Sequence, residues 1–144
     1  MTEDVTIEVL NPQPTLFTNT ESDLDNNSIV LRLSTGNISS LLTADLMREA
    51  EWELVRQRAD LTSTALKVGH HGSDSSTTPE FLAVVNPQLA IISAGADNKF
   101  GHPSAEVLER LQKKLNPQNI FRTDQQGTIE FIIDGEKLWV EVER

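Results

Sequence analysis

The sequence contains no cysteine, which excludes a disulfide framework and a zinc site built from thiolates. Any metal ion must therefore be held by carboxylates and by histidine, which is itself scarce, with three residues. Hydrophobic runs are short as well, and none approaches the roughly 18 apolar residues that a membrane-spanning helix needs. The acidic start, Met1-Thr2-Glu3-Asp4, lacks the basic and apolar regions of a signal peptide. We expect a soluble chain without a membrane segment.

Basic residues are also few, with 12 Lys and Arg against 22 Asp and Glu and a formal net charge of -10. Neutralising phosphates requires clustered Lys and Arg, so this balance argues against broad affinity for nucleic acid. It does not exclude a nuclease, because such an enzyme can carry its positive charge as metal ions. A simpler reading is that the acidity only aids solubility.

The composition of the 144 residues, 38% hydrophobic and 24% charged, is typical of one globular domain. No repeat or linker divides it, so we expect a single domain over 1–144. Alternating strands and helices predict an α/β fold. The predicted strands cover 5–10, 28–33, 38–43, 64–68, 89–93, 120–122, 128–133 and 137–142, with hairpins at 34–37 and 134–136. Helices are predicted after Asp45, over 79–85 and over 103–115, and a surface loop over 18–27.

All three histidines lie in two loops that follow apolar strands, where α/β proteins place reactive groups. His70 and His71 stand between two glycines, which permit unusual backbone angles and leave room for a ligand. Adjacent side chains of an extended chain point in different directions, so we expect one metal ligand and one histidine that faces the substrate or supports the ligand. The alternative is a solvated loop with two incidental histidines.

Asp45 ends the apolar stretch Leu41-Leu42-Thr43-Ala44-Asp45. A carboxylate there can bridge two cations, since each oxygen can bind one. An N-cap of the following helix is an equally physical role for this aspartate.

The third histidine, His102, lies in Asn98-Lys99-Phe100-Gly101-His102-Pro103. Asn98 and Lys99 can hold an anionic substrate while the His102 imidazole donates a proton or a hydrogen bond to a phosphate oxygen. The alternative is that His102 caps the next helix. Ser73 opens a run of hydroxyl residues at another helix start, where free backbone N–H groups favour anions, although capping explains most of these hydroxyls.

Five ordered segments resemble the C-terminal hydrolase domain of the ComEC family of competence proteins. They cover most of the chain, from about Val5 to Glu141. The segments are Asn26–Leu31, Leu41–Asp45, Leu66–Ser73, Ile91–Asn98 with Gly101-His102-Pro103, and Arg122–Thr128.

The resemblance implies the second half of an αββα metallo-β-lactamase sandwich, a mixed sheet with helices on one face. It implies two zinc or manganese ions, hydrolysis of phosphodiesters and DNA as the substrate of a membrane-associated parent protein. Asp45 matches the bridging aspartate, and the His70-His71 pair matches the late histidine ligand, for which His71 is slightly preferred. His70 and His102 are then the catalytic candidates, and Ser73, Asn98 and Lys99 the substrate-binding candidates.

The sequence departs from this family in two ways. Ala44 stands where the family usually has glycine, which should alter a tight turn. The motif His-x-His-x-Asp-His, which supplies most of the metal ligands in the family, is absent. The chain is thus expected to be either a fragment that lacks the N-terminal metal-binding half or a degenerate relative, inactive alone. The alternative function is a non-catalytic binding or assembly module that keeps the scaffold.

A missing half should leave the inner face of the sheet partly uncovered, with Ile29, Leu31, Leu41, Ile91 and Phe131 as the expected apolar residues. Leaving several hundred Å² wet forfeits on the order of 10 kcal/mol, comparable to the stability of a whole domain. We therefore expect the isolated chain to form a homo-oligomer over this face.

Overall fold

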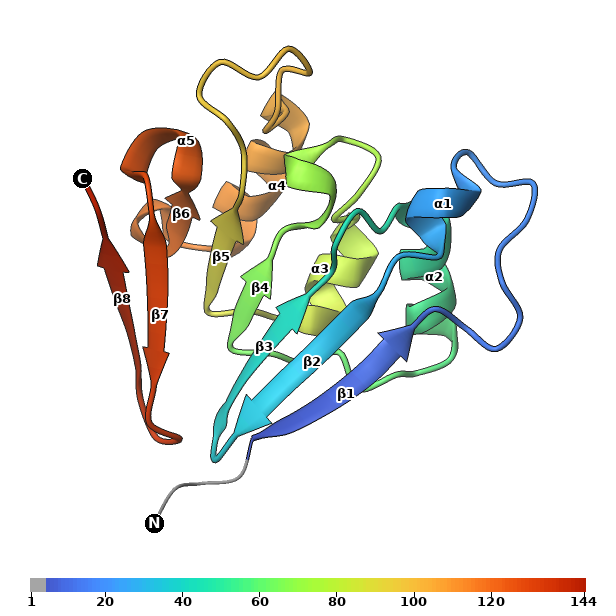
Figure 1. Ribbon diagram of the computed structural model, residues 1–144, viewed down its shortest axis with the longest axis horizontal. Helices are drawn as coiled ribbons and strands as arrows, with labels where there is room; N and C mark the ends of the chain where they lie inside the picture. The colour runs from blue at the N-terminus through green and yellow to red at the C-terminus, as the bar shows by residue number, and fades with distance from the viewer. Residues whose placement is uncertain (1–4) are drawn as a thin grey trace.

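The computed structural model of the protein describes residues 5–144 and has an α/β architecture built on a mixed six-stranded sheet (Figure 1). The strands follow one another in sequence order, β1 to β6, and the last two strands pair as a separate hairpin, β7–β8. Pairing is antiparallel from β1 to β3 and parallel from β3 to β6. The strands are β1 Thr6–Asn11, β2 Val30–Thr35, β3 Ile38–Leu42, β4 Ala65–Lys67, β5 Leu89–Ile92, β6 Ile120–Arg122, β7 Ile129–Ile133 and β8 Leu138–Val142.

The helices connect the parallel strands or flank them. They are α1 Asp23–Asn26, α2 Arg48–Arg56, α3 Pro79–Val85, α4 Ala105–Lys114 and α5 Thr123–Gln126, with short 3-10 turns η1 Gly69–Gly72 and η2 Pro117–Asn119. The α/β class, every predicted strand and both hairpins are confirmed, with strand ends shifted by at most two residues. Within residues 5–144 no helix combines the length and the apolar character needed to cross a membrane.

The three longer helices are found where they were predicted, although two of them start later than expected, and one short helix was missed. The expected loop over 18–27 contains α1, because the Ser22 hydroxyl accepts the backbone N–H of Asp25 and caps a turn. Helix α2 starts at Arg48 because the chain first turns at Thr43, whose carbonyl accepts the Leu46 N–H. Helix α4 starts at Ala105 because the Ser104 hydroxyl caps it.

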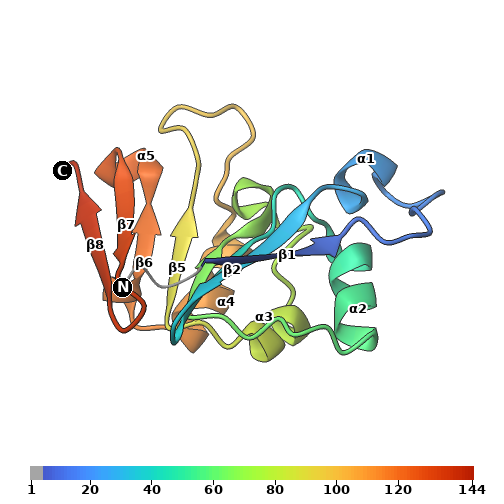
Figure 2. The ribbon, with the colours of Figure 1, turned by 60° about the horizontal axis from the view of Figure 1, so that its bottom comes forward.

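One face of the sheet holds the hydrophobic core. Helices α2, α3 and α4 all lie against this face, as Figure 2 shows. Their apolar stripes meet the strand residues that point the same way. The large, fully buried members are Phe81, Leu41, Leu46, Leu54, Leu61, Leu66, Ile92, Leu111, Val30, Val68 and Val85.

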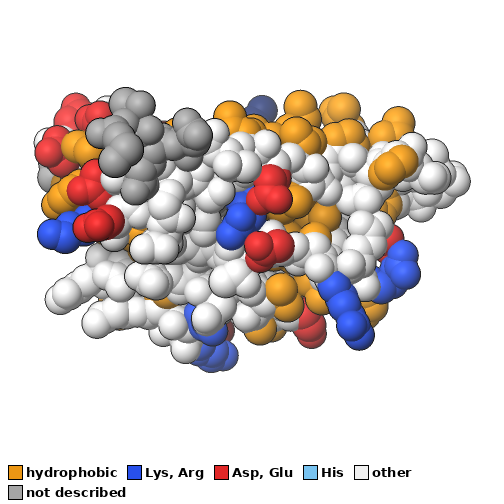
Figure 3. Space-filling model, turned by 90° about the horizontal axis from the view of Figure 1, so that it is seen from below, with side chains coloured by type: hydrophobic (Ala, Val, Ile, Leu, Met, Phe, Trp, Pro, Cys, Tyr) orange, Lys and Arg blue, Asp and Glu red, His pale blue; other side chains and the backbone are white. Residues whose placement is uncertain are grey.

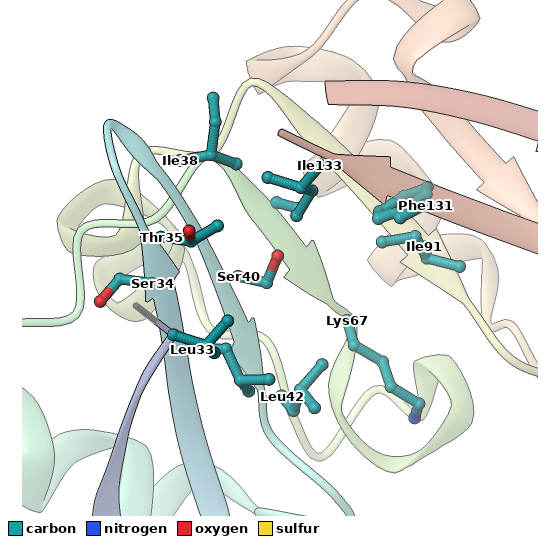
Figure 4. A pocket seen from close by; sticks show the side chains of 12 residues that line it. Leu33, Ser34, Thr35, Ile38, Ser40, Leu42, Lys67, Ile91, Phe131 and Ile133 are labelled. Atoms are coloured by element: carbon teal, nitrogen blue, oxygen red, sulfur yellow. The ribbon is translucent and has the colours of Figure 1, made fainter. Parts of the chain in front are cut away.

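The opposite face of the sheet is apolar too but only partly covered. The β7–β8 hairpin covers its β5–β6 end, where Phe131 meets Phe121 edge to face with ring centroids 6.2 Å apart. Between the hairpin and β2–β3 lies a cavity of about 440 Å³ lined by residues such as Leu33, Leu42 and Ile133 (Figure 4). Over β1 this face is bare, with Ile7 60% and Val9 65% exposed.

The expected set of partly uncovered residues is correct except for one member. Ile29 is exposed, and Leu31, Ile91 and Phe131 are half-buried. Leu41 is instead fully buried, because alternate residues of β3 face opposite sides and Leu41 faces the helices. Figure 3 shows hydrophobic side chains along one rim of the molecule.

Candidate functional site

The three loops singled out in the sequence emerge from the same edge of the sheet. Strands β3, β4 and β5 are parallel neighbours, so their carboxyl ends meet at one rim (Figure 1). Asp45 follows β3, His70 and His71 follow β4, and His102 ends the long loop after β5. From the opposite edge, Figure 3 shows Lys, Arg, Asp and Glu, and no histidine comes into view.

Asp45 and His71, which follow the neighbouring strands β3 and β4, lie in contact at this rim. The Nε2 atom of His71 lies 3.4 Å from Oδ1 of Asp45, and both side chains are about half exposed. The parallel pairing of β3 and β4 therefore brings these two side chains together. The alternative role of Asp45 as an N-cap is wrong, because α2 begins at Arg48 without any side-chain cap.

The hydrogen bond made by Nδ1 of His71 determines which tautomer the neutral ring adopts, and therefore whether Nε2 carries a proton. Its Nδ1 lies 2.7 Å from the backbone carbonyl of Ser93, which can only accept, so Nδ1 carries a proton. In the neutral ring the Nε2 lone pair then faces the carboxylate of Asp45. Two acceptors at this distance repel each other unless a proton or a metal ion lies between them. A histidine with Nδ1 bonded to a carbonyl is the usual arrangement of a metal ligand.

The backbone that carries the histidines is tightly wound. His70 and His71 themselves have positive φ, 48° and 56°, and the His70 N–H donates to the Ala44 carbonyl at 2.9 Å. The unusual backbone angle predicted for a flanking glycine is confirmed at Gly72, which has a φ of 82°, and both glycines lie where the chain is closely packed. A Cβ on Gly72 would lie 2.6 Å from Cβ of Pro103, and one on Gly69 would lie 3.3 Å from the Leu46 carbonyl. These contacts lock the β3, β4 and β5 loops together.

His70 is oriented by the hydroxyl run that follows it. Its Nδ1 lies 3.3 Å from the Ser75 hydroxyl, which in turn lies 2.9 Å from the Ser73 hydroxyl. Ser73 is buried beneath the loop, where it also accepts the Ser75 N–H. Ser75 escaped the sequence analysis, because nothing in a run of serines and threonines singles out one member.

Glu51 is a second residue that the sequence analysis missed. Its carboxylate is fully buried on α2 and accepts the backbone N–H groups of Thr77 and Thr78, the latter at 2.8 Å. Burial raises the pKa of this carboxyl above its usual value, and the hydrogen bonds from Thr78 and Thr77 oppose the rise. Glu51 thereby anchors the hydroxyl run to the helix. The available signal was a carboxylate on the buried stripe of α2 with Ala50 and Leu54.

The loop after β5 is closed by Asn98. Its amide group donates to the carbonyls of His102 and Gly95 at 2.6 and 2.7 Å, and its oxygen accepts the His102 N–H at 2.9 Å. Lys99 is exposed, with Nζ 5.3 Å from the centre of the Phe100 ring. Phe100, another residue that the sequence analysis did not select, stacks on His102.

His102 lies near His70, with ring centroids 6.1 Å apart. Its alternative role as a helix cap is wrong, because Ser104 caps α4. Burial lowers the pKa of His102 below its usual value, and the neighbouring His70 and His71 lower it further. A neutral imidazole at this rim can accept or relay a proton.

The donor set of the rim consists of oxygen and nitrogen, which zinc and manganese both accept. Asp45 and His71 are the pair positioned to contribute ligands. Within residues 5–144 no three histidine, aspartate or glutamate side chains are grouped to hold one metal ion.

No family model matches the sequence. The chain is 40% identical over 129 residues, 90% of its length, to ComE operon protein 3 of Bacillus subtilis. It is 36% identical over 112 residues, 76% of its length, to Competence protein ComA of Neisseria gonorrhoeae. These relatives point to the competence family.

Recombination protein 2 of Haemophilus influenzae is also similar, with 39% identity over 89 residues, 62% of the chain. The chain spans only a small part of each relative, 16%, 16% and 11% respectively. The similarity to competence proteins therefore concerns one segment of much longer molecules. It agrees with the resemblance drawn from the sequence motifs.

Proposed function

We propose that this chain is part of a metal-dependent phosphodiesterase that acts on DNA during DNA uptake. The observation that carries the proposal is the His71–Asp45 pair, in which Nε2 of His71 lies 3.4 Å from a carboxylate oxygen while Nδ1 is held by the Ser93 carbonyl. The competence relatives supply the biological setting. The remaining ligands would come from another part of a longer protein, as the size of the relatives allows.

In this proposal Asp45 and His71 hold one or two zinc or manganese ions. When bound, such ions polarise a phosphoryl oxygen and lower the pKa of water. The neighbouring residues have separate tasks. His70, held through Nδ1 by Ser75, would face the substrate, and His102 would donate a hydrogen bond or proton to the phosphate or leaving oxygen.

In the same proposal, one of the three substrate-binding candidates contacts the substrate and the other two position the site. Lys99, which is exposed, attracts the phosphate backbone. Asn98 shapes the loop through its three hydrogen bonds, and Ser73 supports the position of His70 through Ser75. The last two therefore act on the geometry of the site rather than on the phosphate itself.

The test uses the protein encoded by the complete gene, assayed with labelled DNA and added zinc or manganese. Asp45→Asn and His71→Gln should each reduce hydrolysis by more than the roughly 10- to 100-fold that losing the partner of a metal ligand costs. The control is Asp60→Asn, an exposed aspartate beside Arg32, which should keep its activity. Hydrolysis unchanged in both site variants would disprove the assignment.

The second candidate is a non-catalytic binding or assembly module. The half-covered apolar sheet face favours it, since Ile7 and Val9 are available for contact with another protein segment. This candidate predicts that the complete protein lacks DNA hydrolysis with any divalent metal and that Asp45→Asn leaves its biological function intact.

A further inference from the structure

Phe100 is an exposed aromatic residue at the rim of the candidate site. Its side chain is 71% exposed, although burying a phenylalanine normally stabilises a protein by about 1.5–3 kcal/mol. One ring face stacks on His102, with centroids 5.9 Å apart and planes 18° from parallel. Core packing does not explain the position of this ring.

The ring also forms one wall of a pocket of about 200 Å³. The other lining residues are His71, Ala94, Gly95, Asn98 and His102. The pocket thus extends from His71, the contact partner of Asp45, to an aromatic ring. Its size suits one flat ring system and excludes a base-paired duplex.

The platform is held in place before any ligand binds. Asn98 bonds both backbone groups of His102, and the Thr123 hydroxyl bonds both backbone groups of Ala94. A preformed pocket avoids the entropy cost of ordering a loop on binding.

Lys99 supplies a positive charge next to this ring. Lys99 carries its ammonium group 5.3 Å from the centre of the Phe100 ring, and three imidazoles lie on the same edge. A cation beside an aromatic face matches a nucleotide, whose phosphate and base are joined. Single-stranded nucleic acid is bound by this combination of positive charge and aromatic stacking.

We propose that Phe100 is a stacking platform for an unpaired nucleobase of the DNA strand whose phosphate lies at His71 and His102. The inference rests on the proposed function and makes it more specific, because only a strand with free bases reaches the ring. Single-stranded DNA, or a frayed end, is then the substrate. Lys99 contacts the phosphate next to the stacked base.

The experiment uses the complete protein carrying Asp45→Asn, so that binding is measured without cleavage. The probe is oligothymidylate with one 2-aminopurine, whose fluorescence is quenched by stacking. Phe100→Leu should weaken binding by about 5- to 150-fold and abolish the quenching, whereas Phe100→Trp should retain both. The matched control is Trp52→Leu, which removes an aromatic side chain of similar exposure, 65%, from α2.

Two further probes complete the test. A probe with an abasic site in place of the 2-aminopurine, and a duplex of the same sequence, should bind the Phe100→Leu and Phe100 proteins alike. The proposal is overturned if Phe100→Leu keeps affinity and quenching, if the abasic probe loses affinity equally, or if single strands do not bind. Hydrolysis by the protein with Asp45 is assayed separately, so loss of the stacking result alone leaves the proposed function standing.

Discussion

The carboxylate of Glu51 accepts the backbone N–H of Thr78 at 2.8 Å, which ties the middle of α2 to the start of α3. The same carboxylate accepts the Thr77 N–H. Two donors of a buried turn therefore depend on one side chain. That turn carries Ser75, which orients His70.

Glu51→Ala should destabilise the chain by about 2–4 kcal/mol, because two buried N–H groups lose their acceptor. Urea unfolding measures the loss. The matched control is Glu80→Ala, an exposed glutamate on α3, which should stay within about 0.5 kcal/mol. Equal losses in the two variants would contradict the anchoring role of Glu51.

Ala44→Gly should stabilise the chain by about 1 kcal/mol, because Ala44 has a φ of 45°, which glycine adopts without strain. Thermal or urea unfolding measures the change. Ala83→Gly, on the exposed side of α3, should have the opposite sign, since glycine is unfavourable within a helix. A loss of stability in Ala44→Gly would show that the turn does not store this strain.

The lowered pKa of His102 predicts how stability depends on pH. The unfolded chain binds this proton more tightly than the folded chain, so stability is complete above the usual value of 6.5. It falls as the pH drops below 6.5 toward the lower folded pKa. The difference between the unfolding free energies of the protein and His102→Gln, measured from about pH 5 to about pH 8, should show this slope. A flat difference would contradict the burial of His102.

The isolated chain should bind zinc weakly, because a stable site normally takes three or four protein ligands and the rim positions two. Isothermal calorimetry checks this, with Asp45→Ala for comparison. A tight site of one zinc per chain that survives Asp45→Ala would place the metal elsewhere and remove the basis for the ligand assignment.

The isolated chain should also form a dimer or larger assembly through the apolar sheet face. An interface above about 1,000 Å² is expected if the bare part of β1 and β2 is covered. Light scattering over a range of concentrations measures the state. Val9→Lys, at a residue 65% exposed on this face, should favour the monomer, whereas Thr6→Lys should have little effect. A monomer at high concentration would be contrary to this expectation.

Much of the fold was predictable, because the spacing of apolar residues indicates the strands and helices and their order along the chain indicates which strands are neighbours. Alternation of strands and helices fixes parallel neighbours, and parallel neighbours bring Asp45 close to His71. Which residues of a strand face the helices was harder to predict. Strand β3 has leucines on both faces, and Leu41 is the one that points to the helices. Apolar character alone does not distinguish the two faces of such a strand.

The supporting residues of the site were not predictable in the same way. Glu51 acts across 26 residues on Thr77, and Asn98 acts on a backbone rather than on a ligand. Such contacts depend on tertiary distances that no local pattern encodes. Phe100 was passed over because an apolar residue in a loop is an ordinary feature of protein surfaces.

The parallel part of the sheet separates two kinds of connection. The segments 43–47, 68–78 and 93–104 leave the carboxyl ends of β3, β4 and β5, whereas 57–64, 86–88 and 115–119 enter the amino ends of β4, β5 and β6. Selection on chemistry and selection on folding thus act on different stretches of chain. A designer can exchange the loop that carries Phe100 while the helices, and the core that they bury, keep their sequence.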